Sequence, residues 1–196
     1  DECTSGFRSV VGGNHLKYGV NPDLLVLGKT LGNGYAVTAV VGTRDIMSEA
    51  LSSFISSTFW TERIGSVAGL TSLMKMEEED APHRINTLGS SIGEYWKVLG
   101  SRHGLEIEVS GIAALPRFGI VGFDGQVVKT FVTQEMLKNG ILASTACYVS
   151  IAHEGDVLNQ YYEALDGVFA QISACDSNSE LRGRLEHGVA SAGFAR

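Results

Sequence analysis

The sequence lacks any long apolar run. No stretch of about 18 or more consecutive apolar residues occurs, so no typical transmembrane helix is expected. A basic amino-terminal region followed by an apolar stretch, the mark of a secretory signal peptide, is also missing. Lysine and arginine are not clustered, and the formal net charge is -7. Neither nucleic acid nor an anionic membrane is therefore an expected partner.

Cysteine is scarce, and several familiar catalytic motifs are absent. The three cysteines, Cys3, Cys147 and Cys175, are odd in number and widely spaced. This pattern matches neither a disulfide framework nor a zinc site, and it favours a reducing, cytoplasmic location. The sequence contains no metal-ligand spacing, no Walker motif and no Ser/His/Asp arrangement. It therefore gives no support to metal, nucleotide or serine-hydrolase chemistry.

The composition itself is that of a globular protein. Of the 196 residues, 44% are hydrophobic and 19% are charged, enough to form one sizeable core or two small ones. The chain opens at Asp1 without a methionine, in a segment that looks like the middle of a domain. We therefore expect a fragment, or the C-terminal part of a longer chain.

Apolar periodicity predicts an α/β domain followed by a smaller α+β domain. The expected strands are at 23–29, 36–42, 105–110, 117–122 and within 141–151, and the expected helices are at 46–52, 63–76, 81–99, 130–138 and 154–174. We predict domains at 1–78 and 79–176. Residues 177–196 are polar and rich in glycine, so they are expected to form a loosely docked tail.

Lys29 is the first candidate for a chemical role. It stands at the end of a strand predicted to be buried, with Gly28, Gly32 and Gly34 leaving space around the backbone. Burial is costly for a charged amine and lowers its pKa, as a lysine that forms a Schiff base requires. The alternative is a structural residue that ends the strand and extends into water.

Three motifs together favour the first interpretation. They are DECTSGFR at 1–8, YGVNPDLLVLGKTLGNG at 18–34 and SSTFWTERIG at 56–65. In this order they resemble the class III aminotransferases of pyridoxal phosphate fold type I, and most of all the branch similar to glutamate-1-semialdehyde aminomutase. The resemblance continues through 140–143 and 148–153, and so covers nearly all of the chain except the tail.

The resemblance implies a cofactor, pyridoxal 5′-phosphate, and a residue for each part of it. Lys29 would form the internal aldimine. Asp1 precedes Lys29 by 28 residues, the spacing found in the branch that this sequence most resembles. Its carboxylate would pair with the pyridine nitrogen of the cofactor, so that the protonated ring can act as an electron sink. Cys3 would pack against the cofactor ring. Thr58 would bind the phosphate of the cofactor held in the neighbouring subunit, and Thr61 is the alternative residue for this role.

Other readings of these residues stay open. Asp1 could be a helix cap or a surface acid, and Thr58 could cap a helix amino terminus. His153 is expected to cap the last helix. Many amino-acid-specific relatives carry an arginine shortly before that helix, where it binds the substrate carboxylate; residues 144–153 contain none. Substrates like ornithine or acetylornithine are therefore not supported.

The resemblance also implies a fold and a function for the whole. The fold would be α/β, namely the C-terminal part of the large domain of such a transferase and then a small α+β domain. The function would be amino-group transfer, as an aminotransferase or a 2,1-aminomutase, on a small-molecule amino donor and acceptor in a homodimer. The N-terminal half, which holds most of the phosphate site, is not in this sequence. The alternative is a truncated, inactive chain that acts only as a folding or dimerisation unit.

Overall fold

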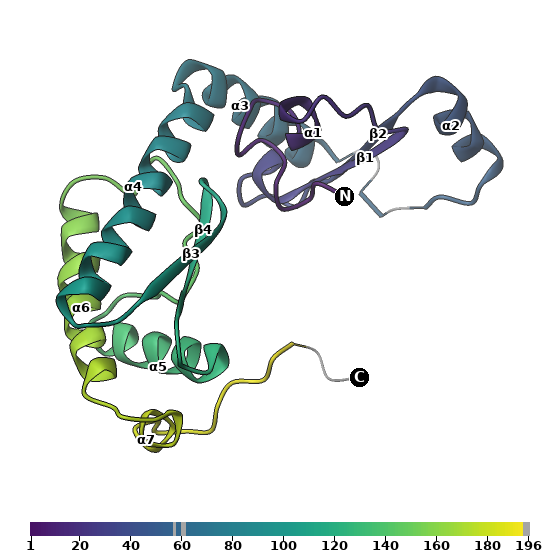
Figure 1. The fold of residues 1–196 in the computed structure, drawn as a ribbon. Coiled ribbons are helices and arrows are strands. Elements are labelled where there is room, and N and C mark those ends of the chain that lie inside the picture. Colours follow the sequence, from purple (N-terminus) through teal and green to yellow (C-terminus); the bar gives the residue numbers. More distant parts are fainter. Residues whose placement is uncertain (57, 60–61, 194–196) are drawn as a thin grey trace. The chain divides into compact units, whose positions relative to one another are not determined.

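The chain folds into two compact units, Asp1–Asn86 and Thr87–Arg196, which are unit 1 and unit 2 below (Figure 1). The structure is a computed structural model, and it describes residues 1–56, 58–59 and 62–193. Among these residues, no helix is both long enough and apolar enough to cross a membrane.

Unit 1 combines a two-stranded sheet with short helices and one long helix. Its elements are α1 (Asn14–Lys17), β1 (Leu24–Leu27), the 3-10 helix η1 (Lys29–Leu31), β2 (Ala39–Gly42), α2 (Arg44–Ser48), the 3-10 helix η2 (Glu49–Ser52) and α3 (Arg63–Glu78). Helix α4 (Ala81–Arg102) begins in this unit and continues into unit 2.

Strand β1 pairs with β2 in antiparallel register, with Leu24 opposite Gly42 and Leu27 opposite Ala39. The strand lies within the range predicted for it, but its expected burial is wrong in part. Leu27 is 7% exposed, whereas Leu24 is 46% exposed. Leu27 belongs to the core of unit 1, together with Phe7, Leu31 and Met76, and the partly buried Leu25 packs against that core.

The carboxylate of Glu2 ties the first residues of the chain to α1. It accepts hydrogen bonds from the backbone N–H groups of Asn14 and of His15, the latter at 2.8 Å, and lies 3.0 Å from His15 Nδ1. The Glu2 carboxylate therefore caps the amino terminus of α1, because the N-cap residue Gly13 has no side chain that could accept these hydrogen bonds. Burial raises the pKa of Glu2, but these hydrogen bonds outweigh it and leave the pKa below its ordinary value.

Unit 2 packs helices against a second two-stranded antiparallel sheet. Its further elements are β3 (Ile107–Ile112), β4 (Leu115–Ile120), α5 (Gly125–Lys138), α6 (Asp156–Ser173) and α7 (Asn178–Gly183). Trp96 of α4 contacts Phe118 of β4 with ring centroids 4.9 Å apart, and Phe118 contacts Phe169 of α6 at 5.5 Å. These edge-to-face aromatic contacts join two helices and the sheet in one core.

Three predictions for unit 2 are wrong. Within 141–151 there is no strand, only an isolated bridge between Ala146 and Arg117. The segment 177–196 is not uniformly a loose tail, because it contains α7, whose Leu181 is fully buried. Helix α5 starts at Gly125, five residues earlier than expected, because the Asp124 carboxylate caps its first N–H groups at 2.8 and 3.2 Å.

Candidate functional site

Lys29 lies two residues after the end of β1 and is the first residue of η1. Its backbone has a φ of 40°, a left-handed conformation that is rare outside glycine and costs about 1–2 kcal/mol. Its side chain is exposed, and Nζ donates a hydrogen bond to Thr4 Oγ1 at 2.5 Å. The expected burial of Lys29 is therefore wrong: its side chain is exposed, although Gly28 before it and Leu31 after it are buried.

The segment Asp1–Thr4 lies beside this end of β1. The N–H of Glu2 donates to the carbonyl of Val26 at 2.9 Å, which places the segment along the strand. Asp1 is exposed, and its Oδ1 accepts from the N–H of Cys3 at 2.8 Å. Three of the four predicted residues, Asp1, Cys3 and Lys29, are thus carried by two adjoining segments.

Gly28 allows the close approach of these two segments. A Cβ atom placed on Gly28 would lie 2.6 Å from the sulfur of Cys3 and 3.3 Å from a methyl group of Thr38. A side chain here would push the Cys3 sulfur away from the backbone that precedes Lys29. Because only hydrogen fits at this position, the sequence requires glycine immediately before the lysine.

Thr58 is not joined to the other three predicted residues. It is exposed, and no hydrogen bond in the described part of the chain connects it to Lys29 or Asp1. The alternative reading of Thr58 as a helix cap is wrong, because the N-cap of α3 is Glu62, whose carboxylate accepts from the N–H of Ile64 at 3.0 Å. The fallback, Thr61, lies outside the described residues.

Two further polar residues accompany Lys29. Thr4 was not predicted, although it belongs to the first motif, and it provides the oxygen that accepts from Lys29 Nζ. Thr30 follows the lysine, and its buried hydroxyl has no hydrogen-bond partner among the described residues. Buried hydroxyl groups are normally paired, so Thr30 has capacity for one more polar contact.

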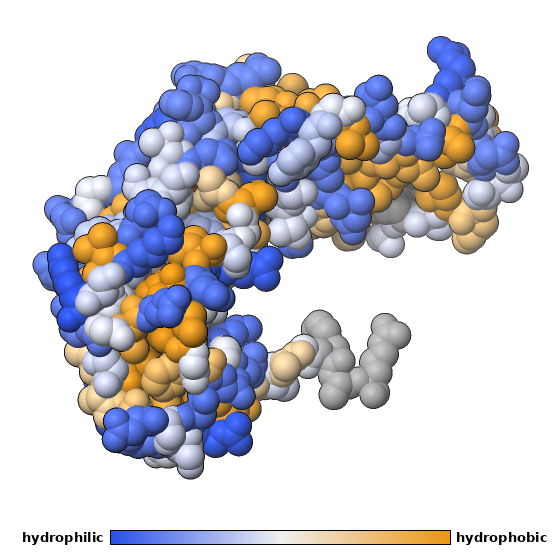
Figure 2. Space-filling model, viewed as in Figure 1, coloured by the Kyte–Doolittle hydropathy of each residue, from blue (hydrophilic) through white to orange (hydrophobic). Residues whose placement is uncertain are grey.

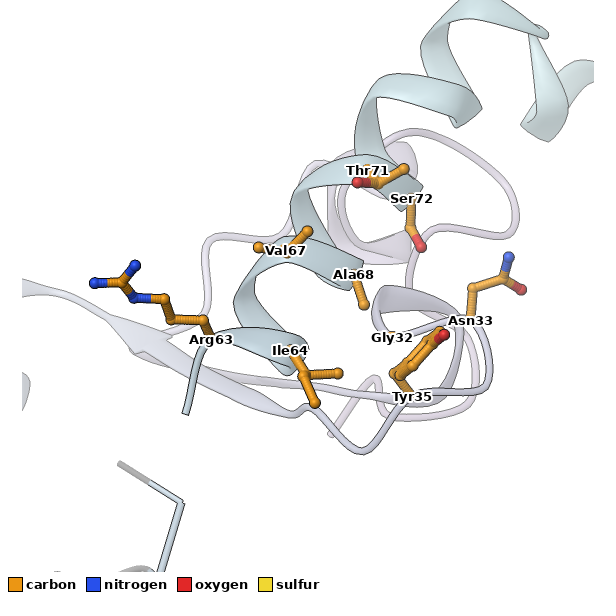
Figure 3. Close-up of a pocket in the computed structure, with 9 residues that line it drawn as sticks. All are labelled: Gly32, Asn33, Tyr35, Arg63, Ile64, Val67, Ala68, Thr71 and Ser72. Carbon is orange, nitrogen blue, oxygen red and sulfur yellow. The ribbon is translucent and has the colours of Figure 1, made fainter. Parts of the chain in front are cut away.

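A cavity of about 520 Å³ opens next to η1 in unit 1. Its walls are the turn after the lysine, with Gly32, Asn33 and Tyr35, and the first three turns of α3. Figure 3 shows Ile64 and Val67 projecting from α3, while the Arg63 side chain extends away from Asn33 and Tyr35. The walls are therefore mostly apolar and small, and suit the flat face of an organic group better than a charged one.

His153 does not cap α6, contrary to expectation. The N-cap is Gly155, which makes no side-chain hydrogen bond. His153 Nδ1 instead accepts from the N–H of Ser150 at 3.1 Å, so the ring closes the loop before the helix.

The arrangement of elements resembles that of solved transaminase structures. The chain superimposes on the Sphingopyxis sp. MTA144 FumI protein, solved in its "PLP internal aldimine form", with a TM-score of 0.79 at 23% identity, covering 92% of this chain and 45% of that one. An omega-transaminase from Sphaerobacter thermophilus gives a TM-score of 0.76 at 23% identity, covering 89% and 44%. The predicted α/β transaminase fold is confirmed.

The sequence places the chain within that class. The family model for "Aminotransferase class-III" matches residues 1–152, and this chain belongs to that family. A glutamate-1-semialdehyde 2,1-aminomutase from Methanocaldococcus jannaschii is 26% identical over 188 residues, which cover 86% of this chain and 43% of the relative. A 2'-deamino-2'-hydroxyneamine transaminase from Streptomyces kanamyceticus is 26% identical over 170 residues, which cover 84% of this chain and 43% of the relative.

Family membership confirms pyridoxal 5′-phosphate as the predicted cofactor. The residues at the end of β1 fit its aldehyde and ring. Lys29 presents an exposed amine, and Gly28 keeps Cys3 and the backbone close to it. The chain spans about 43% of the length of the curated relatives that it matches.

Proposed function

We propose that this chain is part of an enzyme that transfers amino groups with pyridoxal phosphate, and that Lys29 binds the cofactor covalently. The observation that carries the proposal is the pairing of two motif segments. Residues 1–4 are hydrogen-bonded beside the end of β1, and they hold Lys29 Nζ through Thr4 at 2.5 Å. An exposed amine on a strained turn, supported from a second segment, is arranged for chemistry rather than for packing.

Each predicted residue then has a stated task. Pyridoxal phosphate, when bound, supplies the electron sink for bond breaking at the substrate carbon. The Asp1 carboxylate would hold the proton on the ring nitrogen, and Cys3 would pack against the ring. Lys29 Nζ, once displaced by the substrate amine, would accept the proton from the substrate carbon and return it. Thr58 would bind phosphate across the interface of a homodimer.

Borohydride trapping tests the role of Lys29. The chain is incubated with pyridoxal phosphate, reduced and digested, and the peptides are mapped by mass spectrometry. We expect the added mass on the peptide that contains Lys29, and its loss in Lys29→Arg. Lys17, an exposed lysine of the same unit, provides the control, because Lys17→Arg should keep the label. Labelling of Lys17 and Lys29 to the same extent would refute the assignment.

The reaction type is the second part of the proposal. The lack of arginine in 144–153 favours an amine or a sugar over an α-amino acid with a bound carboxylate. An aminotransferase passes the amino group to an oxo acid, whereas an aminomutase needs no second acceptor. Supplying an oxo acid to the holoenzyme and measuring the new amino acid separates the two. A cytoplasmic location, consistent with three free cysteines, is proposed with it.

A second candidate is an inactive chain that serves for folding or dimerisation. The observation that favours it is the exposure of large apolar side chains in unit 1: Leu51 is 91% exposed and Phe54 is 96% exposed. Figure 2 shows apolar residues at the surface of this unit. Such surfaces mark association sites. Sedimentation would show self-association under this hypothesis, together with no visible absorption band after addition of pyridoxal phosphate.

A further inference from the structure

A second cavity lies in unit 2, between α5, α6 and the loop that joins them. Its volume is about 890 Å³, within the range of about 300–1,000 Å³ typical of small-molecule sites. The residues that line it all belong to unit 2, and they come from α5, from the loop at 140–153 and from the first turns of α6.

The charge of this wall has one sign. No aspartate or glutamate is among the lining residues. Lys129 lines this cavity and also a neighbouring one beside Glu186, and it forms no ion pair within the described part of the chain. An anion that enters the cavity would therefore meet an amine without a competing carboxylate.

Two neutral groups add hydrogen-bond donors. His153 Nδ1 accepts from the N–H of Ser150, so the ring proton lies on Nε2, which can only donate. The Tyr161 oxygen accepts from Trp96 Nε1 at 2.8 Å, and its own O–H has no acceptor in the residues that the structure covers. Lys129, His153 and Tyr161 therefore all offer hydrogen to a ligand.

The Tyr161 hydroxyl and the Cys147 thiol, which also line the cavity, stay neutral. Burial raises the pKa of the Tyr161 hydroxyl far above its ordinary value, and raises the pKa of Cys147 to about 11. At neutral pH neither group carries a negative charge that would repel an anion. The remaining wall is largely apolar, with Ile141, Val157 and Leu158.

We propose that this cavity binds a monocarboxylate with an apolar body, with its carboxylate on Lys129, His153 and Tyr161. One cation and two neutral donors match a single negative charge, whereas a phosphate dianion is usually held by several cations or by a cluster of backbone N–H groups. The apolar side chains then cover the body of the ligand. This site is independent of the proposed role of Lys29.

Octanoate is the probe, and the indole N–H of Trp96 is the reporter, because that group donates directly to Tyr161. Trp60, the only other tryptophan, is replaced by phenylalanine so that a single indole signal remains in the NMR spectrum. We expect octanoate to shift this signal along a saturating curve. Octan-1-ol, which has the same body without the charge, should bind at least about fivefold more weakly.

Matched variants identify the groups that bind. Lys129→Met should raise the octanoate dissociation constant about fivefold or more, and Lys97→Met, a lysine of α4 paired with Glu94, should leave it unchanged. His153→Asn keeps an acceptor for the Ser150 N–H but removes the Nε2 donor, so it should also weaken binding. The proposal is overturned if octanoate gives no shift, if octan-1-ol binds equally well, or if Lys129→Met and Lys97→Met behave alike.

Discussion

Lys29 and Thr4 are 25 residues apart in the sequence, yet the amine of one contacts the hydroxyl of the other. The sequence predicts Lys29 through its spacing from Asp1, because that motif records the role of the lysine in the family. The sequence does not predict the role of Thr4. The contact between Thr4 and Lys29 depends on the hydrogen bond between Glu2 and Val26 and on the left-handed turn at Lys29. Long-range contacts of this kind carry no periodic pattern that a sequence could show.

Removing the Thr4 hydroxyl should weaken cofactor binding. The Thr4→Val variant keeps the shape of the side chain but loses the acceptor for Lys29 Nζ. Hydrogen bonds to charged groups contribute about 1.5–3 kcal/mol, and exposure reduces this value. We therefore expect the dissociation constant of pyridoxal phosphate to rise roughly three- to tenfold. Absorbance titration measures it. Thr4→Ser, which restores the hydroxyl, should bind as the wild type does, and equal binding by Thr4→Val would contradict the positioning role.

Glu2 should stabilise unit 1 in a pH-dependent way. Its folded-state pKa is lowered, so its stabilisation is complete above the unfolded value of about 4.3 and is lost as the pH falls through the folded value. Glu2→Gln removes acceptors for the N–H groups of Asn14 and His15, and should reduce the free energy of unfolding at pH 7 by about 1–3 kcal/mol.

Denaturant unfolding at pH 7 and below pH 4 tests the Glu2 prediction. The difference between wild type and Glu2→Gln should narrow at the lower pH, where the wild-type carboxylate is protonated as well. Glu77→Gln, an exposed position of α3, should change the stability at neither pH. A constant difference across this range would show that the charge of Glu2 is not what stabilises the fold.

At the scale of elements, the long helices and the ranges of β1 and β2 could be predicted, whereas some other short pieces could not. Helices α3, α4 and α6 follow apolar repeats and end within three residues of their predicted ends. The strand expected within 141–151 is instead a loop that bridges to β4 at Ala146 and makes a few backbone hydrogen bonds with residues 114–118. Helix α7 has six residues, too few for a periodic signal, and its place depends on burying Leu181.

Leu181 should therefore anchor the C-terminal segment to unit 2. Its side chain is fully buried, and Leu181→Ala should destabilise the unit by about 2–4 kcal/mol through lost burial and the cavity that remains. Leu142→Ala provides the comparison, because Leu142 is 86% exposed and its change should cost less than about 0.5 kcal/mol. Thermal unfolding followed by near-ultraviolet circular dichroism would measure both. Similar midpoints for the two variants would mean that α7 is not part of the core.

At the scale of the whole molecule, the two units have separate cores. Among the described residues, the core cluster of unit 1 consists of Phe7, Leu27, Leu31 and Met76, with partly buried side chains packed against it. Unit 2 buries a larger aromatic and aliphatic set that includes Trp96 and Phe169. The strongest apolar periodicity of the chain lies in α4 and α6, which contribute Trp96 and Phe169 to the core of unit 2. Since a small core contributes less burial, unit 1 should open more readily than unit 2.

A substitution in the smaller core should therefore act on unit 1 alone. Met76 is 8% exposed on α3, and Met76→Ala removes one of the four residues that fix β1 and η1. Hydrogen exchange followed by mass spectrometry should show faster exchange at 24–31, whereas the backbone of β3, β4 and α6 should exchange as in the wild type. Ile172→Ala, in the core of α6, should give the opposite pattern. If either variant accelerated exchange equally in both units, the chain would unfold as one cooperative body, and the strained turn at Lys29 would be stabilised by the core of unit 2 as well as by its own.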